Sequence, residues 1–161
     1  MKIYQHYSIY GFSNTYIVGN EETSQAIIVD PAELTTSMID QIQHNGYELT
    51  AILITHNHIH HTRGVKTLMR IYQPEVYASN MRIYDIPCRK VRDRDEFKVA
   101  GFAVAAIALP GHSQDSMVYR IGLSFFTGDA LHAGVIGRTT SAFNAQADRK
   151  STRLNSSHRI R

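Results

Sequence analysis

Four histidines stand within six residues, directly after a stretch that has the pattern of a buried β-strand. Residues 49–55 (LTAILIT) form a nearly continuous apolar run, which is typical of a strand covered on both faces. The histidines follow in residues 56–61 (HNHIHH). Imidazole is the commonest side-chain metal ligand, and a His-x-His pair can direct two rings at one ion. The end of this strand is therefore predicted to carry a metal site.

Two further predicted strands end in side chains of the same kind. His112 follows residues 102–109 within the sequence PGHS, and Asp129 follows residues 124–127 within the sequence TGDA. In α/β proteins, binding and catalytic groups gather where strands end, because rigid elements hold the loops there. We therefore expect His112 and Asp129 to meet the histidine segment.

The rest of the pattern predicts an α/β chain rich in short strands. Strands are expected where Ile, Val and Tyr cluster between turn residues, at 2–10, 13–19, 25–30, 49–55 and 75–78. Helices are expected where apolar residues recur at helical spacing, at 34–42 and 65–72. Two hairpins are expected at 97–109 and 117–127. This alternation suits sheets with helices packed outside them.

Composition places the chain among single-domain globular proteins. Of its 161 residues, 43% are apolar and 19% charged, which excludes a disordered or fibrous chain. The longest apolar run, residues 102–110, is far shorter than the roughly 20 residues that span a membrane. The first residues lack the apolar core of a secretory signal, and the one cysteine excludes a disulfide framework. We therefore expect a cytoplasmic protein with no membrane partner.

The positive charge of the chain is concentrated at its end. Five basic residues and one aspartate fall within residues 148–161, which carry +4, so residues 1–147 carry −1 of the net +3. Residues 148–158 (DRKSTRLNSSH) also match the translation of a common sequencing-library adapter. We therefore expect a truncated domain over residues 1–147 and a non-native tail over residues 148–161. With a charge of −1, that domain has no electrostatic footprint for nucleic acid.

As a set, the sequences THNHIHHTRG, PGHS and TGDALHAGVIGR resemble the metallo-β-lactamase superfamily, and within it the glyoxalase II-like hydrolases. The segments FSNTYIVG and AIIVDPAE fit the opening strands of the same family, so the resemblance covers residues 3–140. It implies an αββα sandwich, two sheets with helices on both outer sides. That sandwich is expected to be incomplete at the C-terminus.

The resemblance also implies a ligand set. The family's first metal is held by the histidines that match His56, His58 and His112, and Asp129 matches the residue that bridges two metals. The second metal is held by a histidine matching His61, an aspartate and a later histidine expected beyond residue 147. In this chain His60 stands in place of that aspartate. One zinc ion is therefore expected, and two in a full-length protein.

The resemblance implies hydrolysis of a small-molecule thioester or ester by metal-bound hydroxide. A bound zinc ion lowers the pKa of water to about 7. Asp129 and His60 are the expected catalytic residues, Asp129 because it can orient the attacking water. His60 has three alternatives: it ligates the metal, it acts as a base, or it points away. Thr55 is expected to support the ligand loop.

Two other functions compete with hydrolysis. An iron-dependent persulfide dioxygenase needs two histidines and one carboxylate with open positions, which His56, His112 and Asp129 could supply. A catalytically impaired metal-binding relative is the other, and the histidine at position 60 motivates it. Nucleic-acid cleavage, known in the family, ranks last because of the charge of residues 1–147. Nothing in the sequence indicates an oligomeric state.

Overall fold

One strand, β4 (Glu48–Leu53), faces two hydrophobic cores at once. In the computed structural model, which describes residues 1–132 and 135–136, Ile52 packs into one core. Ala51 and Leu53 pack into the other. Since successive side chains of a strand point to opposite faces, a strand that is apolar along most of its length must be covered on both. The burial predicted from the apolar run is confirmed.

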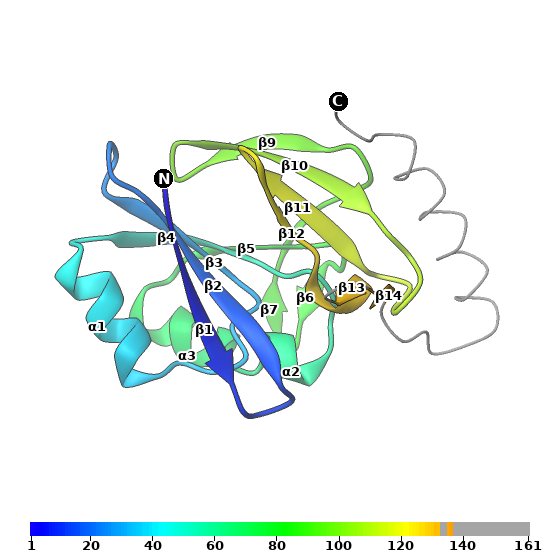
Figure 1. Ribbon diagram of the computed structural model, residues 1–161, viewed down its shortest axis with the longest axis horizontal. Helices are drawn as coiled ribbons and strands as arrows, with labels where there is room; N and C mark the ends of the chain where they lie inside the picture. The colour runs from blue at the N-terminus through cyan, green and yellow to red at the C-terminus, as the bar shows by residue number, and fades with distance from the viewer. Residues whose placement is uncertain (133–134, 137–161) are drawn as a thin grey trace.

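Three layers surround these two cores: helices, a six-stranded sheet and a four-stranded sheet (Figure 1). The first sheet is mixed, with antiparallel pairing as far as β3 and parallel pairing beyond it. Its strands, in spatial order, are β1 (Lys2–Ser8), β2 (Ser13–Asn20), β3 (Gln25–Val29), β4, β5 (Glu75–Ala78) and β8 (Arg89–Lys90).

The second sheet is antiparallel throughout. Its strands, in spatial order, are β12 (Ser124–Phe126), β11 (Met117–Ile121), β10 (Phe102–Ala108) and β9 (Glu96–Val99). Two short hairpins pair β6 (Arg82–Ile83) with β7 (Ile86–Pro87) and β13 (Leu131–His132) with β14 (Val135–Ile136). Both hairpins predicted within this sheet are confirmed.

Helices α1 (Thr36–His44) and α3 (Val65–Ile71) cover the face of the six-stranded sheet that turns away from the second sheet (Figure 1). The Thr35 side chain accepts a hydrogen bond from the backbone N–H of Met38. This capping bond makes α1 begin later than residue 34, where the apolar spacing placed its start. The short helix α2 (Ile59–Thr62) and the 3-10 turn η1 (Gly128–Ala130) carry residues of the site described below.

These layers are three of the four expected in an αββα sandwich. Within residues 1–132 and 135–136, no α-helix covers the outer face of the four-stranded sheet. The expected boundary at residue 147 and the expected tail over residues 148–161 lie outside the described residues. None of the helices in the described part of the chain is long and apolar enough to cross a membrane.

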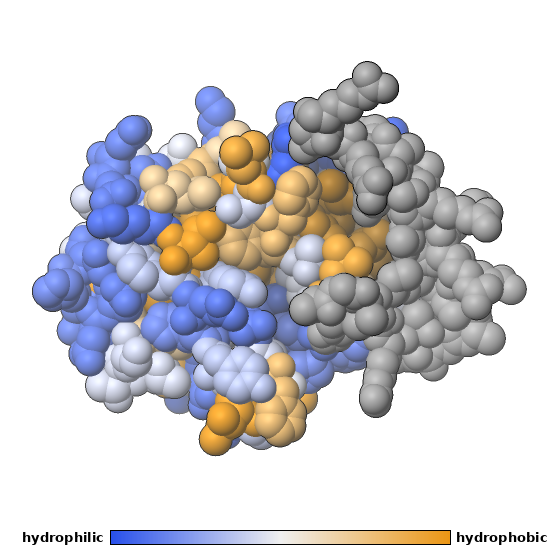
Figure 2. All heavy atoms as spheres, viewed as in Figure 1, coloured by the Kyte–Doolittle hydropathy of each residue, from blue (hydrophilic) through white to orange (hydrophobic). Residues whose placement is uncertain are grey.

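Apolar side chains remain at the surface at two hairpin tips (Figure 2). One group lies over the β11–β12 hairpin, where Leu123 and Phe125 are exposed. The other lies at the tip of the β1–β2 hairpin, where Ile9 and Phe12 are 81% and 77% exposed. The β1–β2 tip lies next to the cluster of histidines, because the backbone of Gly11 packs against His60.

Candidate metal centre

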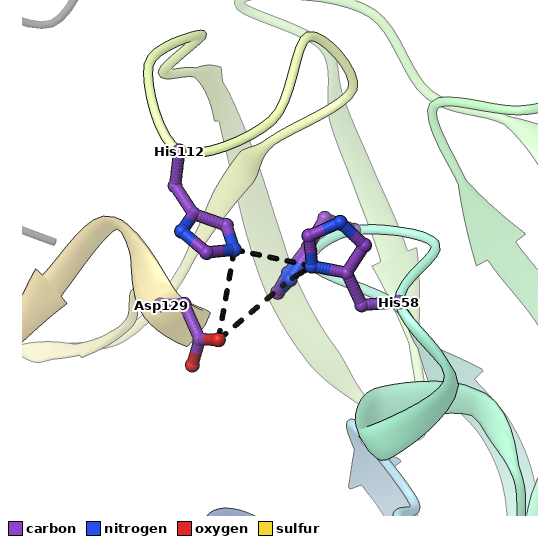
Figure 3. Close-up of side chains that lie close together, drawn as sticks. His58, His112 and Asp129 are labelled. Carbon is purple, nitrogen blue, oxygen red and sulfur yellow. Dashed lines mark hydrogen bonds and ion pairs between the residues drawn. The ribbon is translucent and has the colours of Figure 1, made fainter. Parts of the chain in front are cut away.

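Side chains from three strand ends meet at one end of the sandwich. His56 and His58 follow β4, His112 follows β10, and Asp129 follows β12. His58 Nδ1 lies 3.1 Å from His112 Nε2 (Figure 3). It also lies 2.9 Å from His56 Nε2. Asp129 Oδ2 lies 3.7 Å from His112 Nε2 and 3.9 Å from His56 Nε2. We call this group of four residues the first position.

A second group shares Asp129 with the first. His60 Nε2 lies 3.0 Å from Asp129 Oδ2, and His61 Nε2 lies 3.2 Å from Asp129 Oδ1. We call His60, His61 and Asp129 the second position. Each group, with His56 added to the second, offers ligand atoms that lie within 4.8 Å of one another. The structure thus brings all six residues selected from the sequence to one place, and it turns His60 toward Asp129.

The four histidines that follow β4 do not all lie in a loop between β4 and the next helix. His58 is extended and precedes α2, whereas His60 and His61 lie within α2. The hydroxyl of Thr62 donates a hydrogen bond of 3.1 Å to the carbonyl of His58 and closes this single helical turn. The turn lets neighbouring residues direct both rings at the same carboxylate.

Asp30 holds Thr55 and His61 from behind the site. Its carboxylate accepts hydrogen bonds from the backbone N–H of Thr55 at 2.7 Å and from the Thr55 hydroxyl at 2.6 Å. Asp30 Oδ2 also lies 3.0 Å from His61 Nδ1. An outer carboxylate of this kind fixes the orientation of a ligand imidazole. The sequence analysis missed Asp30, although its place after β3 and before Pro31 is the same strand-end signal as that of Asp129.

Asp115 ties together three loops around the first position. Its Oδ2 accepts hydrogen bonds from the backbone N–H of Asn57 at 2.8 Å and from Asn80 Nδ2 at 2.7 Å, and its Oδ1 accepts one from the Ser113 hydroxyl. Burial raises the pKa of Asp115, but these hydrogen bonds outweigh it and hold the pKa below the usual value. Asn57 lies between His56 and His58, and Ser113 follows His112. Asp115 therefore sets the separation of the two ligand loops.

Gly128 allows Asp129 to approach Thr55. Its φ is +52°, and a Cβ at this position would overlap the Thr55 hydroxyl. A side chain here would therefore push η1, and Asp129 with it, away from the end of β4. Glycine is needed for the close contact as well as for its left-handed backbone.

The electrostatics of the cluster keep its ligand atoms in different protonation states. Burial and the neighbouring His61 and His58 together lower the pKa of His56 to about 3. The carboxylates of Asp30 and Asp129 oppose this shift but do not cancel it. Burial likewise lowers the pKa of His58, with the adjacent His112 adding to the effect. Both imidazoles are therefore neutral at pH 7, with a lone pair free to bind a cation.

His61 and Asp129 shift in the opposite sense. Burial opposes the charge on His61, but the carboxylates of Asp30 and Asp129 overcome it and raise the pKa of His61 to about 10. Burial also opposes the charge on Asp129, yet contacts with His61 and His60 hold its pKa well below the usual value. In the metal-free protein a protonated His61 therefore lies between the side chains of Asp30 and Asp129.

The donor set fits a divalent transition metal. Both ring nitrogens of His61 are buried and make no hydrogen bond of regular geometry, although carboxylate oxygens lie 3.0 and 3.2 Å away. In the first position, three imidazole nitrogens converge on one carboxylate oxygen. Buried nitrogens without such a bond are costly unless a cation or a proton occupies the space between them. Imidazole with carboxylate is a ligand combination that zinc accepts.

Comparisons with known proteins agree with the fold. The chain belongs to the metallo-beta-lactamase superfamily, whose family model matches residues 9–159. Its fold is similar to that of a metallo-beta-lactamase from Staphylococcus aureus, with a TM-score of 0.86 and 20% identity over 96% of this chain and 52% of that one. The fold class and the family expected from the sequence resemblance are therefore confirmed.

Two of the relatives that are similar in sequence are named as hydrolases. A hydroxyacylglutathione hydrolase of Chromohalobacter salexigens is 32% identical over 149 residues, which are 89% of this chain and 58% of the relative. A Bacillus velezensis protein named "Probable polyketide biosynthesis zinc-dependent hydrolase BaeB" is 32% identical over 121 residues, 72% of this chain and 54% of the relative. The chain spans about half the length of the curated relatives it matches.

Two glycine variants distinguish the effect of the close contact at Gly128 on stability from the effect of backbone strain. Gly122 also has a positive φ, of +59°, but a Cβ there would meet only the end of the Met1 side chain at 3.8 Å. We expect Gly122→Ala to lower the free energy of unfolding by about 1–2 kcal/mol through strain. Gly128→Ala should cost roughly 1–3 kcal/mol more, because it also overpacks the contact with Thr55. Urea unfolding of the metal-free proteins measures both, and equal losses would contradict the close contact.

The raised pKa of His61 makes the stability of the metal-free protein depend on pH. A group whose pKa is raised by folding contributes its full stabilisation below its unfolded pKa and loses it as the pH rises through the folded one. The contribution of His61 should therefore be complete below pH 6.5 and vanish near pH 10. In urea unfolding with a chelator present, the stability difference between the unaltered protein and His61→Gln should shrink from pH 7 to 10.5. A difference that stays constant would show that His61 is not protonated, and His44→Gln, on the exposed end of α1, is the control.

Proposed function

We propose that the chain is the metal-binding part of a hydrolase that cleaves a small-molecule thioester or ester. The observation that carries this proposal is the first position. Three imidazoles and a carboxylate from three different strand ends offer ligand atoms within 4.8 Å of one another. The names of the two relatives, a hydroxyacylglutathione hydrolase and a zinc-dependent hydrolase, support both the reaction class and zinc as the metal.

The residues that would hold the metal are His56, His58, His112 and Asp129 in the first position. A zinc ion bound there would supply a Lewis acid that polarises a carbonyl group and lowers the pKa of a water molecule to about 7. Asp129 is ionised at neutral pH, because its pKa is held well below the usual value. Its carboxylate faces both positions and is the group that would orient the attacking water.

A cavity beside the cluster has room for part of an acyl group. It has a volume of about 260 Å³, and His61 and Asp129 line it together with Phe12, Phe125 and Leu131. None of the described residues that line it is lysine or arginine. An acyl chain that enters this cavity would exclude water from the carboxylate side of the cluster, without meeting a fixed positive charge.

The proposed setting of the reaction follows from the sequence. We place it in the cytoplasm, because a chain with one cysteine suits a reducing compartment. The proposed partner is the small-molecule substrate alone, since residues 1–147 carry a net charge of −1 and so have no electrostatic footprint for nucleic acid.

Thioester cleavage after metal reconstitution tests the proposal. The protein is stripped with a chelator, loaded with zinc, and given an S-acylglutathione or an S-acylpantetheine while the released thiol is measured. We expect turnover with zinc that chelation abolishes. His112→Ala should lower it by more than about 100-fold, because losing even an outer partner of a ligand costs roughly 10- to 100-fold. His44→Ala should leave it unchanged.

The competing functions predict different outcomes in the same experiment. An iron-dependent persulfide dioxygenase would consume oxygen with a persulfide after iron loading and leave thioesters intact. We propose hydrolysis rather than this alternative because His58 can add a third imidazole to His56, His112 and Asp129, whereas such an oxygenase needs two histidines and one carboxylate. The catalytically impaired relative predicts a third outcome. The zinc-loaded protein would then cleave neither substrate, and the substitution His60→Asp would not restore activity.

A further inference from the structure

Contacts from the β1–β2 hairpin hold His60 in a position where its ring faces Asp129. Its backbone carbonyl accepts a hydrogen bond of 2.7 Å from the Ser13 hydroxyl at the start of β2. Gly11, with a φ of +75°, packs so closely on His60 that a Cβ on Gly11 would overlap the His60 Cβ. The β1–β2 hairpin therefore clamps both the backbone and the base of the side chain. The clamp leaves the ring 24% exposed, with Nε2 at 3.0 Å from Asp129 Oδ2.

His61 provides a second nitrogen that faces the same point. Its side chain is 2% exposed, and its Nε2 lies 3.2 Å from Asp129 Oδ1 without a hydrogen bond of regular geometry. The rings of His60 and His61 are 4.5 Å apart between centroids. Two imidazole nitrogens from one helical turn thus converge on a carboxylate whose other side faces the first position. The facing ligand atoms of His60, His61 and Asp129 all lie within 4.8 Å of one another.

We propose that His60 is a metal ligand, and that His60, His61 and Asp129 hold a second divalent ion of the zinc, cobalt or iron class. The inference builds on the metal centre of the proposed function and adds a second ion to it. Two imidazoles with one carboxylate suit such borderline ions, whereas manganese and magnesium prefer sites made of carboxylates. Both ions share the charge of Asp129, so the second ion binds more weakly than the first.

A cobalt titration counts the ions without any substrate. Metal-free protein is titrated with Co²⁺, and the visible absorption and the heat of binding are recorded. The unaltered protein should take up two equivalents, the second more weakly. His60→Ala should retain the first equivalent with unchanged affinity and weaken the second by more than about 100-fold. His44→Ala, which removes an exposed imidazole far from the cluster, should still bind two.

A carboxylate at position 60 tests the ion preference. His60→Asp should again bind two equivalents, and its second position should accept Mn²⁺ better than that of the unaltered protein, because it then offers two carboxylates. Circular dichroism of each variant checks that the fold is intact. The same preference for Mn²⁺ in both proteins would contradict the assignment of His60 as a ligand.

Two results would overturn the inference. One is uptake of a single equivalent by the unaltered protein. The other is unchanged uptake of two equivalents by His60→Ala, which would make His60 a hydrogen-bonding partner of Asp129 only. Both are distinct from failure of the proposed function. A protein that binds two ions but cleaves no thioester would support the second position and contradict the proposed function. A protein that cleaves thioesters with a single ion would do the reverse.

Discussion

The carboxylate of Asp129 is the constraint on which the arrangement of the histidines depends. Five imidazoles surround it, and their rings approach closely, with centroids 4.3 Å apart for His56 and His61 and 4.5 Å for His56 and His58. Imidazoles this close disfavour protonation of one another, which is one reason that the pKa of His56 falls to about 3. Among the described residues of the two positions, Asp129 is the only carboxylate. It is therefore the shared negative charge that lets both groups receive a cation.

The geometry of the cluster depends on the contacts between the two sheets. The backbone N–H of Met117, at the start of β11, donates a hydrogen bond of 2.8 Å to the carbonyl of Thr55, just beyond the end of β4. The side chain of Thr55 is held in turn by Asp30. Its hydroxyl lies where a Cβ on residue 128 would be, so Gly128 can pack closely against it. Because these contacts join strands of different sheets, the closing of the sandwich itself brings Asp129 to the histidines.

Much of this could be predicted from the sequence, because the relevant signals are local. The apolar run of β4 predicted a strand buried on both faces, and the strand ends before His56, His112 and Asp129 predicted where the cluster would form. Asp30 carries the same strand-end signal, but the partners of Asp30 and Asp115 could not be predicted from it. Thr55 lies 25 positions from Asp30 and Asn57 lies 58 positions from Asp115, and such pairs leave no periodic pattern in the chain.

The orientation of His60 is a second feature that the sequence could not predict. The sequence identified it as a departure from its family but left its orientation open, because the residues that clamp it, Gly11 and Ser13, are 47 or more positions earlier. Only the packing of the β1–β2 hairpin on α2 turns the ring toward Asp129. Local patterns thus predicted which elements form and which residue types gather, whereas contacts between distant segments decide what each side chain faces.

Anomalous diffraction from zinc-soaked crystals tests the central claim, that these side chains form a metal centre around Asp129. The account predicts an anomalous peak in the first position, about 2.0–2.1 Å from the facing nitrogens of His56, His58 and His112 and in contact with the Asp129 carboxylate. Zinc found only on exposed histidines such as His44, with no peak among these four residues, would contradict it.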